Sequence, residues 1–293
     1  MKTSTGVSVI ICCYNSVNRI TTTLQYLECQ NTSFNWELVI VNNNSTDNTE
    51  RIIKDVLSKS DVLKSKTRLV NEGLSGLNYA RQRGVKEAKH DFVLFCDDDN
   101  WLNKNYLQNA FNFLSTNESY GIAGGNGIEK CEINPPKWFD KHKSVYAIGC
   151  RKDGEVSNVY GAGMLLRKNL IENITLAMSG RKGKSLSSGD DSEICLIARN
   201  KGYKIRQLCH NTFFHYVPKE RLTYSYIMRM AKASGKSKAE LYLLERPKWK
   251  GVGYRLKTDV YLLISKLFKS DYFSFKYTFT RISSYWYARF IKA

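Results

Sequence analysis

The sequence predicts an α/β protein with a mixed, mainly parallel sheet flanked by helices and a helical C-terminal extension that is basic and aromatic. Three observations lead to this fold class. Short apolar runs alternate with helical patterns through the N-terminal third of the chain. Each apolar run ends in polar side chains. Near residue 220 the composition changes, and basic and aromatic residues then interleave to the end.

The alternation begins with residues 7–13, a continuous β-branched run that is typical of a strand buried on both faces. Apolar residues then recur at helical spacing at Ile20, Leu24 and Leu27. The same reading predicts further strands and helices in the order strand 37–43, helix after 45–50, strand 67–71, helix 76–89 and strand 91–97. Strands separated by helices of this length predict right-handed crossovers and a mainly parallel sheet.

Polar residues follow every one of these strands. They are Tyr14-Asn15, the asparagines 42–44, residues 71–73 and the aspartates 97–99. In open α/β sheets, ligands bind beyond the carboxyl ends of the strands. We therefore expect a binding crevice at this edge of the sheet.

The rest of the chain predicts a less regular second half and a separate extension. A glycine-rich segment, a short strand within 158–171 and a helix after Asp190-Asp191 occupy the middle. Residues 241–293 carry 11 Lys/Arg against 3 Asp/Glu, and positions 262–268 form an apolar helical face. We expect a core domain at 1–220, with halves 1–115 and 116–220, and an extension at 221–293.

Charge and cysteine content narrow the kind of partner and the cellular compartment that we expect. The chain of 293 residues has a net charge of +18, which predicts attraction to an anionic partner. The N-terminal apolar run is too short for a signal peptide, and no segment has the length of a membrane span, so we expect a cytosolic protein. The eight cysteines show no CxxC spacing and are expected to be free thiols.

Two groups of carboxylates are candidates for chemistry. Asp97 and Asp99 at the end of a buried strand fit a hard divalent cation, Mg²⁺ or Mn²⁺; the alternative is a solvated acidic turn. Asp98 between them should point elsewhere, because side chains alternate along a strand. Asp190 and Asp191 precede a helix, where they act either as chemical groups or simply as its N-terminal charges.

A resemblance now connects these features. VSVIICCYNS, ELVIVNNNSTDNT, NEGLSGLNYARQRGVKEAK, FVLFCDDDNW and SGDDSEICLIARNKGY resemble, in order and spacing, the motifs of the family 2 glycosyltransferases. The resemblance covers roughly residues 5–217. It implies the Rossmann-like GT-A fold and a hexosyltransferase-type enzyme that uses a nucleotide diphosphate sugar and a metal. It also implies transfer with inversion at the anomeric carbon.

The resemblance also assigns candidate roles to residues. Asp191 would be the catalytic base, and Asp99, Asp97 and His215 would contact the metal. The nucleotide sugar, with a UDP-sugar favoured over GDP- or dTDP-sugars, would meet residues from three strand ends and one from a helix: Cys12, Tyr14, Asn15, Asn43, Asp97, Asp98 and the helical Arg81. Asn43 replaces an aspartate that the family commonly has, although its amide oxygen still accepts a hydrogen bond. The acceptor would meet Trp138, Gly161, Ala162, Gly163 and Asp190; for Trp138 and the glycine turn the alternative is ordinary loop structure.

The predicted partners follow from the same resemblance. The acceptor is expected to be a glycan hydroxyl, with a polyprenyl-linked acceptor as one form, in cell-surface polysaccharide or lipopolysaccharide assembly. The basic, aromatic extension predicts contact with an anionic membrane at the inner face of the cell membrane; its alternative is a helical cap on the core domain. No nucleic-acid partner is expected.

Three other classes remain open from the residues alone. A metal-dependent nucleotidyltransferase would use a similar sheet, but CCYNSVNR has neither the glycine nor the lysine of a phosphate loop. A non-enzymatic nucleic-acid-binding protein would explain the charge but not the carboxylates. A glycosidase would use two carboxylates without a metal or nucleotide crevice.

Overall fold

The computed structural model describes residues 4–150, 152–177, 180–181, 186, 189–245, 252–269 and 272–291. The side chains of Ser4, Phe268, Lys269 and Ile291 lie outside the description. Phe268 is the last residue of the apolar face predicted at 262–268, and its side chain is therefore outside the described part of the chain.

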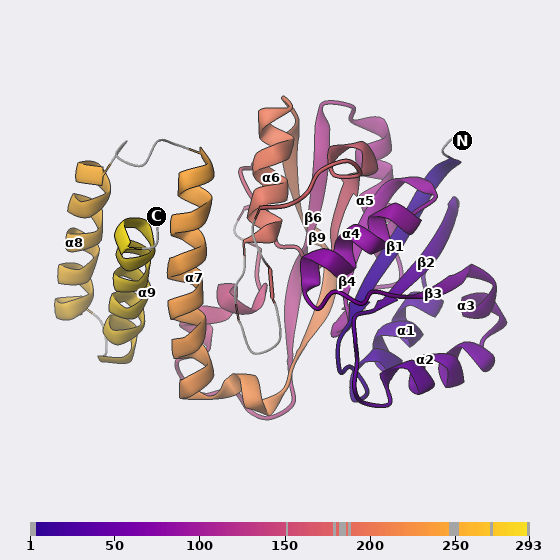
Figure 1. Cartoon of the computed structure of the whole chain (residues 1–293), viewed down its shortest axis with the longest axis horizontal. Helices are drawn as coiled ribbons and strands as arrows, with labels where there is room; N and C mark the ends of the chain where they lie inside the picture. Colours follow the sequence, from indigo (N-terminus) through magenta and orange to yellow (C-terminus); the bar gives the residue numbers. More distant parts are fainter. Residues whose placement is uncertain are drawn as a thin grey trace.

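The described strands form one mixed sheet with the order β3-β2-β1-β4-β8-β6-β9-β5, and β7 pairs with β9 (Figure 1). The first four strands run parallel, β8 runs antiparallel to β4, and β6 and β9 run parallel to each other. The strand bounds are β1 (Ser4–Cys13), β2 (Asn35–Asn42), β3 (Thr67–Asn71), β4 (His90–Asp97), β5 (Asn100–Leu102), β6 (Tyr120–Cys131), β7 (Gly154–Val156), β8 (Met164–Arg167) and β9 (Lys204–Val217).

Helices cover both faces of this sheet. Alternate residues of β1 face opposite sides: Val9 packs with α1, α2, α3 and α5, whereas Ile10 packs with α4 and α6. The helix bounds are α1 (Ile20–Glu28), α2 (Thr49–Ser58), α3 (Asp61–Lys66), α4 (Leu77–Glu87), α5 (Tyr106–Thr116), α6 (Asp190–Asn200), α7 (Tyr224–Glu245), α8 (Val252–Lys269) and α9 (Tyr272–Ile291), with short 3-10 helices η1 (Asp140–Tyr146), η2 (Lys168–Leu170) and η3 (Lys219–Leu222). The predicted fold class is confirmed.

The strand register brings the predicted polar ends to one edge. Cys13 pairs with Asn42, and Asn42 pairs with Asn71. On the other side of β1, Cys12 pairs with Asp97. The parallel strands β1 to β4 therefore deliver their carboxyl ends, and the polar residues that follow, to the same place.

The C-terminal helices lie beyond one end of the sheet (Figure 1). Helix α7 packs on the core through a cluster that joins Tyr226, Ile227 and Met230 to Phe139 and Val217. Helix α9 packs on α7, and α8 packs on α9. Because this cluster crosses residue 220, the boundary expected there remains a prediction, although α7 begins close to it at Tyr224.

The contact between α7 and α9 is close enough to require a glycine. A Cβ atom on Gly235 would overlap the carbonyl oxygen of Arg281, whereas a Cβ on Gly253 in α8 would meet nothing within 4 Å. Both glycines lie in helices, Gly235 in the interior of α7 and Gly253 in the first turn of α8, so replacement by alanine gains helix propensity at both and most at Gly235. The two positions differ in the space available.

We predict that Gly235→Ala lowers the free energy of unfolding by about 1–2 kcal/mol, because overpacking outweighs the gain in helix propensity. Gly253→Ala, the matched control, should leave it unchanged or raise it by up to about 1 kcal/mol. Urea unfolding followed by circular dichroism measures both. Equal effects of the two substitutions would contradict this packing.

Candidate active site

The three aspartates after β4 point in different directions and have different partners. The side chain of Asp97 is 36% exposed, and its Oδ1 lies 3.6 Å from Nη2 of Arg81. Asp98 and Asp99 are buried. The adjacent carboxylates thus avoid facing one another, because each has a different cationic neighbour.

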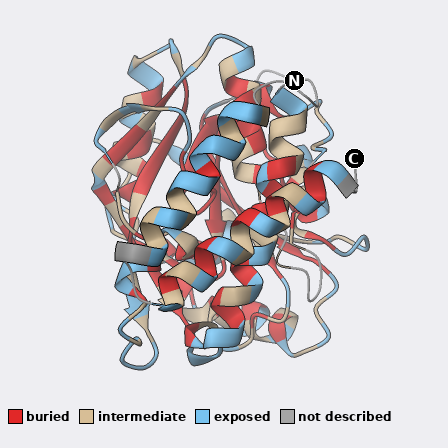
Figure 2. Ribbon diagram, turned by 90° about the vertical axis from the view of Figure 1, so that its left-hand side faces the viewer, coloured by how far each residue is buried: buried red, intermediate tan, exposed pale blue. Residues whose placement is uncertain are grey.

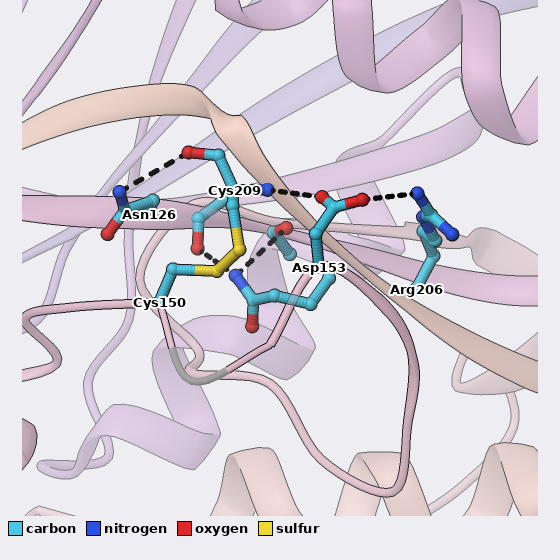
Figure 3. The surroundings of a disulfide bond; sticks show 8 residues. Asn126, Cys150, Asp153, Arg206 and Cys209 are labelled. Atoms are coloured by element: carbon cyan, nitrogen blue, oxygen red, sulfur yellow. Dashed lines mark hydrogen bonds and ion pairs between the residues drawn. A yellow bond between two sulfur atoms is a disulfide. The ribbon is translucent and has the colours of Figure 1, made fainter.

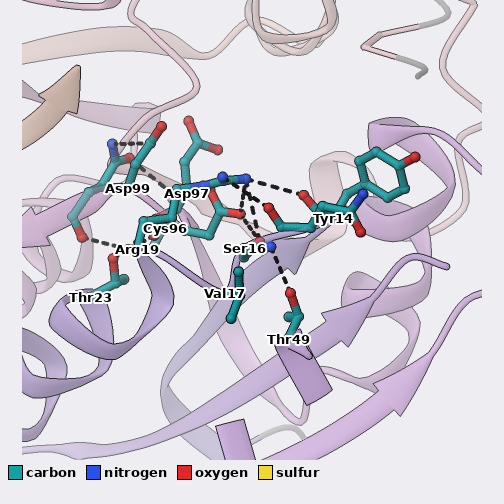
Figure 4. A network of polar contacts seen from close by, with 12 residues as sticks. Tyr14, Ser16, Val17, Arg19, Thr23, Thr49, Cys96, Asp97 and Asp99 are labelled. Carbon is teal, nitrogen blue, oxygen red and sulfur yellow. Dashed lines mark hydrogen bonds and ion pairs between the residues drawn. The ribbon is translucent and has the colours of Figure 1, made fainter. Parts of the chain in front are cut away.

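Asp98 is held by residues at the N-terminal end of α1. Figure 4 shows three of these residues, Ser16, Arg19 and Thr23, near Asp97 and Asp99. Arg19 donates from Nε to Oδ1 and from Nη2 to Oδ2, each at 2.8 Å, which is the bidentate geometry of a strong ion pair. Ser16 donates to the same carboxylate, and Thr23 donates to the Asp98 carbonyl at 2.8 Å. Burial raises the pKa of Asp98, and Arg19 opposes that rise. These contacts place Asp98 in a buried network that supports the strand end.

Asp99 faces β9 and η3. Its Oδ1 lies 3.4 Å from Nε2 of His215, and its Oδ2 accepts from Nη1 of Arg221 at 2.9 Å. Burial alone would raise the pKa of Asp99, but His215 and Arg221 hold it below its ordinary value. Asp99 is therefore a carboxylate across the physiological range.

Asp99 and His215 have the geometry of two ligands of one divalent cation. Asp99 Oδ1 and His215 Nε2 lie 3.4 Å apart, and His215 Nδ1 has no hydrogen-bond partner within the described part of the chain. Among the described residues, no group of three or more His, Cys, Asp or Glu side chains could hold a metal. Mg²⁺ and similar ions commonly take one or two protein ligands and complete their shell with phosphate and water. The residues fit a cation shared with a diphosphate.

Arg81 joins the two groups of carboxylates. It is 5% exposed, its Nη1 donates to Oδ2 of Asp190, and its Nη2 faces Asp97. The guanidinium lies over the ring of Phe95, 4.7 Å from the centroid. Although burial opposes the charge, Asp190 and Asp97 raise the Arg81 pKa, so the side chain stays cationic. Arg81 thus lies between carboxylates that are far apart in sequence.

Asp191 lies next to this ion pair at the start of α6. Its Oδ2 accepts from the Gly161 backbone N–H at 3.2 Å, and its Oδ1 accepts from Ser192 N–H at 2.7 Å. Burial and the negative charge of Asp190 raise the pKa of Asp191, whereas Arg81 opposes the rise. With Asp190 paired to Arg81, Asp191 is the carboxylate of the pair that has no ion-pair partner among the described residues.

The turn before β8 approaches Arg81 and Asp191. A Cβ on Gly161 would lie 3.0 Å from Arg81 Nη2 and 3.3 Å from Asp191 Cβ. Gly163 has a left-handed backbone with φ of +70°, and its carbonyl accepts from the Tyr106 hydroxyl at 2.7 Å. Ala162 is buried in the core. The structure therefore brings Gly161 to the site, whereas Gly163 and Ala162 shape and anchor the turn.

The residues expected near the nucleotide occupy the strand ends. Cys12 is beside Asp97, and burial raises the pKa of its thiol to about 12. Tyr14 is exposed. Asn15 has a positive φ of 51° and accepts from the Thr46 backbone N–H at 2.8 Å.

Asn43 holds the loop after β3. Its Nδ2 donates to the carbonyls of Glu72 and Leu74, at 3.1 and 2.7 Å, and its Oδ1 accepts from Gly76 N–H at 2.8 Å. The amide is buried and fully engaged as a donor. Its oxygen has one lone pair left for a further hydrogen bond.

Trp138 has another environment. It stacks on Phe273 of α9, with centroids 5.2 Å apart and planes 7° from parallel. It belongs to the apolar cluster between the core and α7. This packing explains the position of the Trp138 ring, and its contact with the acceptor stays a prediction.

One expectation about the cysteines is wrong. Cys150 and Cys209 form a disulfide, with Cα atoms 5.5 Å apart, and the other six cysteines are free (Figure 3). Asp153 supports the link by accepting from the Cys209 backbone N–H at 2.9 Å and from Arg206 at 2.7 Å. The two cysteines are separated by 59 positions, and no local motif indicated the pairing.

Arg19 and Arg221 are the site residues that sequence reasoning missed. Each is the cationic partner of one aspartate of the 97–99 cluster. The only available signal was physical: two buried carboxylates require nearby positive charge or a metal. Nothing in the local sequence identified which arginine would supply it.

Comparison with known proteins identifies the family. Residues 8–175 match the model of glycosyl transferase family 2. This is more than half of the chain, and the chain therefore belongs to glycosyl transferase family 2.

Two curated relatives illustrate the match. A poly(ribitol-phosphate) beta-glucosyltransferase of Bacillus spizizenii is 29% identical over 156 residues, which are 50% of this chain and 24% of that protein. The poly(ribitol-phosphate) beta-N-acetylglucosaminyltransferase TarS of Staphylococcus aureus is 34% identical over 113 residues, or 38% and 19% of the two chains. This chain thus spans a quarter or less of the length of these relatives.

Solved structures share the fold over nearly the whole chain. S. aureus TarS 1-349 in complex with UDP-GlcNAc has a TM-score of 0.55 at 17% identity, covering 97% of this chain and 91% of that one. The mannosyltransferase PcManGT from Pyrobaculum calidifontis, in complex with GDP-Man and Mn²⁺, has a TM-score of 0.61 at 19% identity, covering 98% and 86%. These likenesses confirm the predicted GT-A fold.

We predict that Arg81→Gln lowers the free energy of unfolding by about 3 kcal/mol or more, since it leaves the buried carboxylate of Asp190 without its cationic partner. Arg83→Gln is the matched control on the same helix, because Arg83 forms a surface pair with Glu87. It should cost about 0.5 kcal/mol or less. Chemical denaturation of both variants measures the difference; similar values would contradict the central place given to Arg81.

Proposed function

We propose that this chain is an inverting glycosyltransferase that moves a sugar from a nucleotide diphosphate sugar to a hydroxyl group of a glycan acceptor. The observation that carries the proposal is the Arg81 bridge, which holds Asp97 on the donor side and Asp190, next to Asp191, on the other. Family membership favours this function over the nucleotidyltransferase, nucleic-acid-binding and glycosidase alternatives.

Asp191 acts in this proposal as the general base. Its Oδ2 would accept the proton of the acceptor hydroxyl while the oxygen attacks the anomeric carbon of the donor. The bond from that carbon to the diphosphate oxygen breaks, and the nucleoside diphosphate leaves on the opposite side, which inverts the configuration. A raised pKa makes Asp191 a stronger base than an ordinary carboxylate.

Asp99 and His215 would hold the divalent cation, with Asp97 at its margin. The cation, Mn²⁺ or Mg²⁺, supplies positive charge that stabilises the departing diphosphate. The complex of PcManGT with Mn²⁺ supports this part of the proposal. Arg221 and Arg19 keep the aspartate cluster ionised and oriented.

The donor and the setting are also proposals. A UDP-sugar is favoured, because the related TarS structure contains UDP-GlcNAc, and the GDP-Man complex keeps GDP-sugars as an alternative. The named relatives act on poly(ribitol-phosphate), which supports a surface glycan or polymer as the acceptor. No helix within the described ranges has the length and apolar character to cross a bilayer. We place the enzyme at the inner face of the cell membrane as a peripheral protein.

A thermal-shift panel tests the donor class. UDP, GDP and dTDP should each be added with and without Mn²⁺, and the nucleotide that is bound should raise the melting temperature, more so with the metal. Sugar transfer should then be measured with the corresponding donor. Release of pyrophosphate rather than nucleoside diphosphate would indicate nucleotidyl transfer instead.

We predict that Asp191→Asn lowers kcat by a factor of roughly 10²–10⁴, the usual contribution of a general base, while the Kd for the donor stays within about threefold. Asp99→Asn should instead weaken Mn²⁺-dependent donor binding. Isothermal titration and a transfer assay separate the two. Substantial turnover by Asp191→Asn would overturn the assignment of the base.

The pH profile provides a further prediction. Because Asp191 must be deprotonated to accept a proton and its pKa is raised, the acid limb of kcat/KM should lie above the ordinary carboxyl pKa of about 4. Asp190→Asn removes the neighbouring negative charge and should move this limb to lower pH. An acid limb that does not move would show that another group sets it.

A further inference from the structure

Helix α8 turns a charged pair toward α9, on the same side as the half-buried Leu262 and Leu263. Asp259 is only 4% exposed, and its Oδ2 lies 2.9 Å from Nε of Arg255. Trp286 of α9 donates from Nε1 to the same oxygen at 3.1 Å, and the Arg255 guanidinium lies over the ring of Tyr285. The charged pair of α8 therefore faces the protein.

A neighbouring side of α8 carries large apolar residues into solvent. Leu256, Val260, Ile264 and Leu267 recur at intervals of three and four, so they share one face of the helix. Leu267 is 58% exposed and the adjacent Tyr261 is 74% exposed. A helix that lies on a water-soluble protein normally has the reverse arrangement.

Helix α9 continues this pattern. Tyr272, Phe279, Tyr287 and Phe290 are exposed and recur on one face, with Lys276 among them. Figure 2 looks onto this end of the molecule, where α8 and α9 lie in front and exposed segments recur along them. We call the exposed apolar faces of α8 and α9 the end surface.

We propose that the end surface is a docking site for a bilayer that contains anionic lipid, an inference that rests on the proposed peripheral transferase. Aliphatic and aromatic side chains would enter the interfacial region with the helices lying along the membrane. Lys257 and Lys276 would meet the headgroups, each contributing electrostatic attraction. The packing of α8 leaves its exposed apolar side free to face the membrane and turns Asp259 toward the protein.

Charge decides between this partner and a second copy of the chain. Lys257 and Lys276 are exposed on α8 and α9, whereas the acidic residue of these helices, Asp259, is buried and paired with Arg255. A two-fold interface would place the same positive surface on both sides. An anionic bilayer instead complements the charge and accepts the apolar residues, so it fits both features.

The test is co-sedimentation of the full chain with vesicles of phosphatidylcholine alone and with phosphatidylglycerol added. Ile264→Ser/Leu267→Ser should reduce partitioning into the anionic vesicles by roughly tenfold or more, because two half-exposed aliphatic side chains no longer enter the interface. The matched control is Val62→Ser/Ile133→Ser, which alters aliphatic residues of similar exposure, 46% and 50%, outside α8 and α9. This control should bind like the unmodified chain.

The outcomes separate this inference from the proposed function. If the two lysines contribute, the double variant Lys257→Gln/Lys276→Gln should bind the anionic vesicles less tightly, and its binding should depend less on salt. Equal sedimentation of both serine pairs, or no binding by the unmodified chain, would overturn the inference. A dimer by light scattering that Ile264→Ser/Leu267→Ser alone dissociates would assign the surface to a second copy. Sugar transfer to a soluble acceptor should be unchanged in both double-serine variants. If neither the unmodified chain nor any variant transfers sugar, the proposed function is refuted, and vesicle binding is then judged separately.

Discussion

The buried guanidinium of Arg81 is the interaction on which the arrangement of the site depends. It comes from α4, and it contacts Asp97 at the end of β4 and Asp190 at the start of α6. A lone buried charge in this position would be strongly disfavoured, and so would the buried carboxylate of Asp190 without it. The ion pairs therefore fix the relative positions of three elements. They also leave Asp191 as the member of its pair without a cationic partner among the described residues, which supports the role of base proposed for it.

The same principle organises the aspartates of residues 97–99. Three adjacent carboxylates at a strand end are tolerable because Arg81, Arg19 and Arg221 each face a different one. Only Asp97 is appreciably exposed, whereas Asp99 keeps its second oxygen near His215. The cluster thus combines Asp98, which supports the strand end, with Asp99, which is buried beside His215 and Arg221, and Asp97, which is partly exposed beside Arg81.

Much of the fold could be predicted from the sequence because its signals are local. Continuous apolar runs identified β1, β2 and β4, and polar residues at their ends identified the edge that holds the site. The same locality explains why Asp97, Asp99 and Asp191 could be named as candidates from the sequence. Their partners were not predictable: Arg221 lies 122 positions from Asp99, and the disulfide joins Cys150 to a cysteine 59 positions away. Such contacts are set by packing of distant elements, and no short motif records them. Arg81 was expected to face a phosphate, and only the structure revealed its two carboxylate partners.

A crystal structure with Mn²⁺ and the nucleoside diphosphate that the chain binds tests the division of the site most directly, because manganese is located by its anomalous scattering. The account predicts manganese on Asp99 and His215, bridged to the diphosphate, with Asp191 free of metal on the far side of the anomeric position and Arg81 still between Asp97 and Asp190. Manganese bound by Asp190 and Asp191, or a diphosphate that displaces Arg81 from both carboxylates, would contradict it.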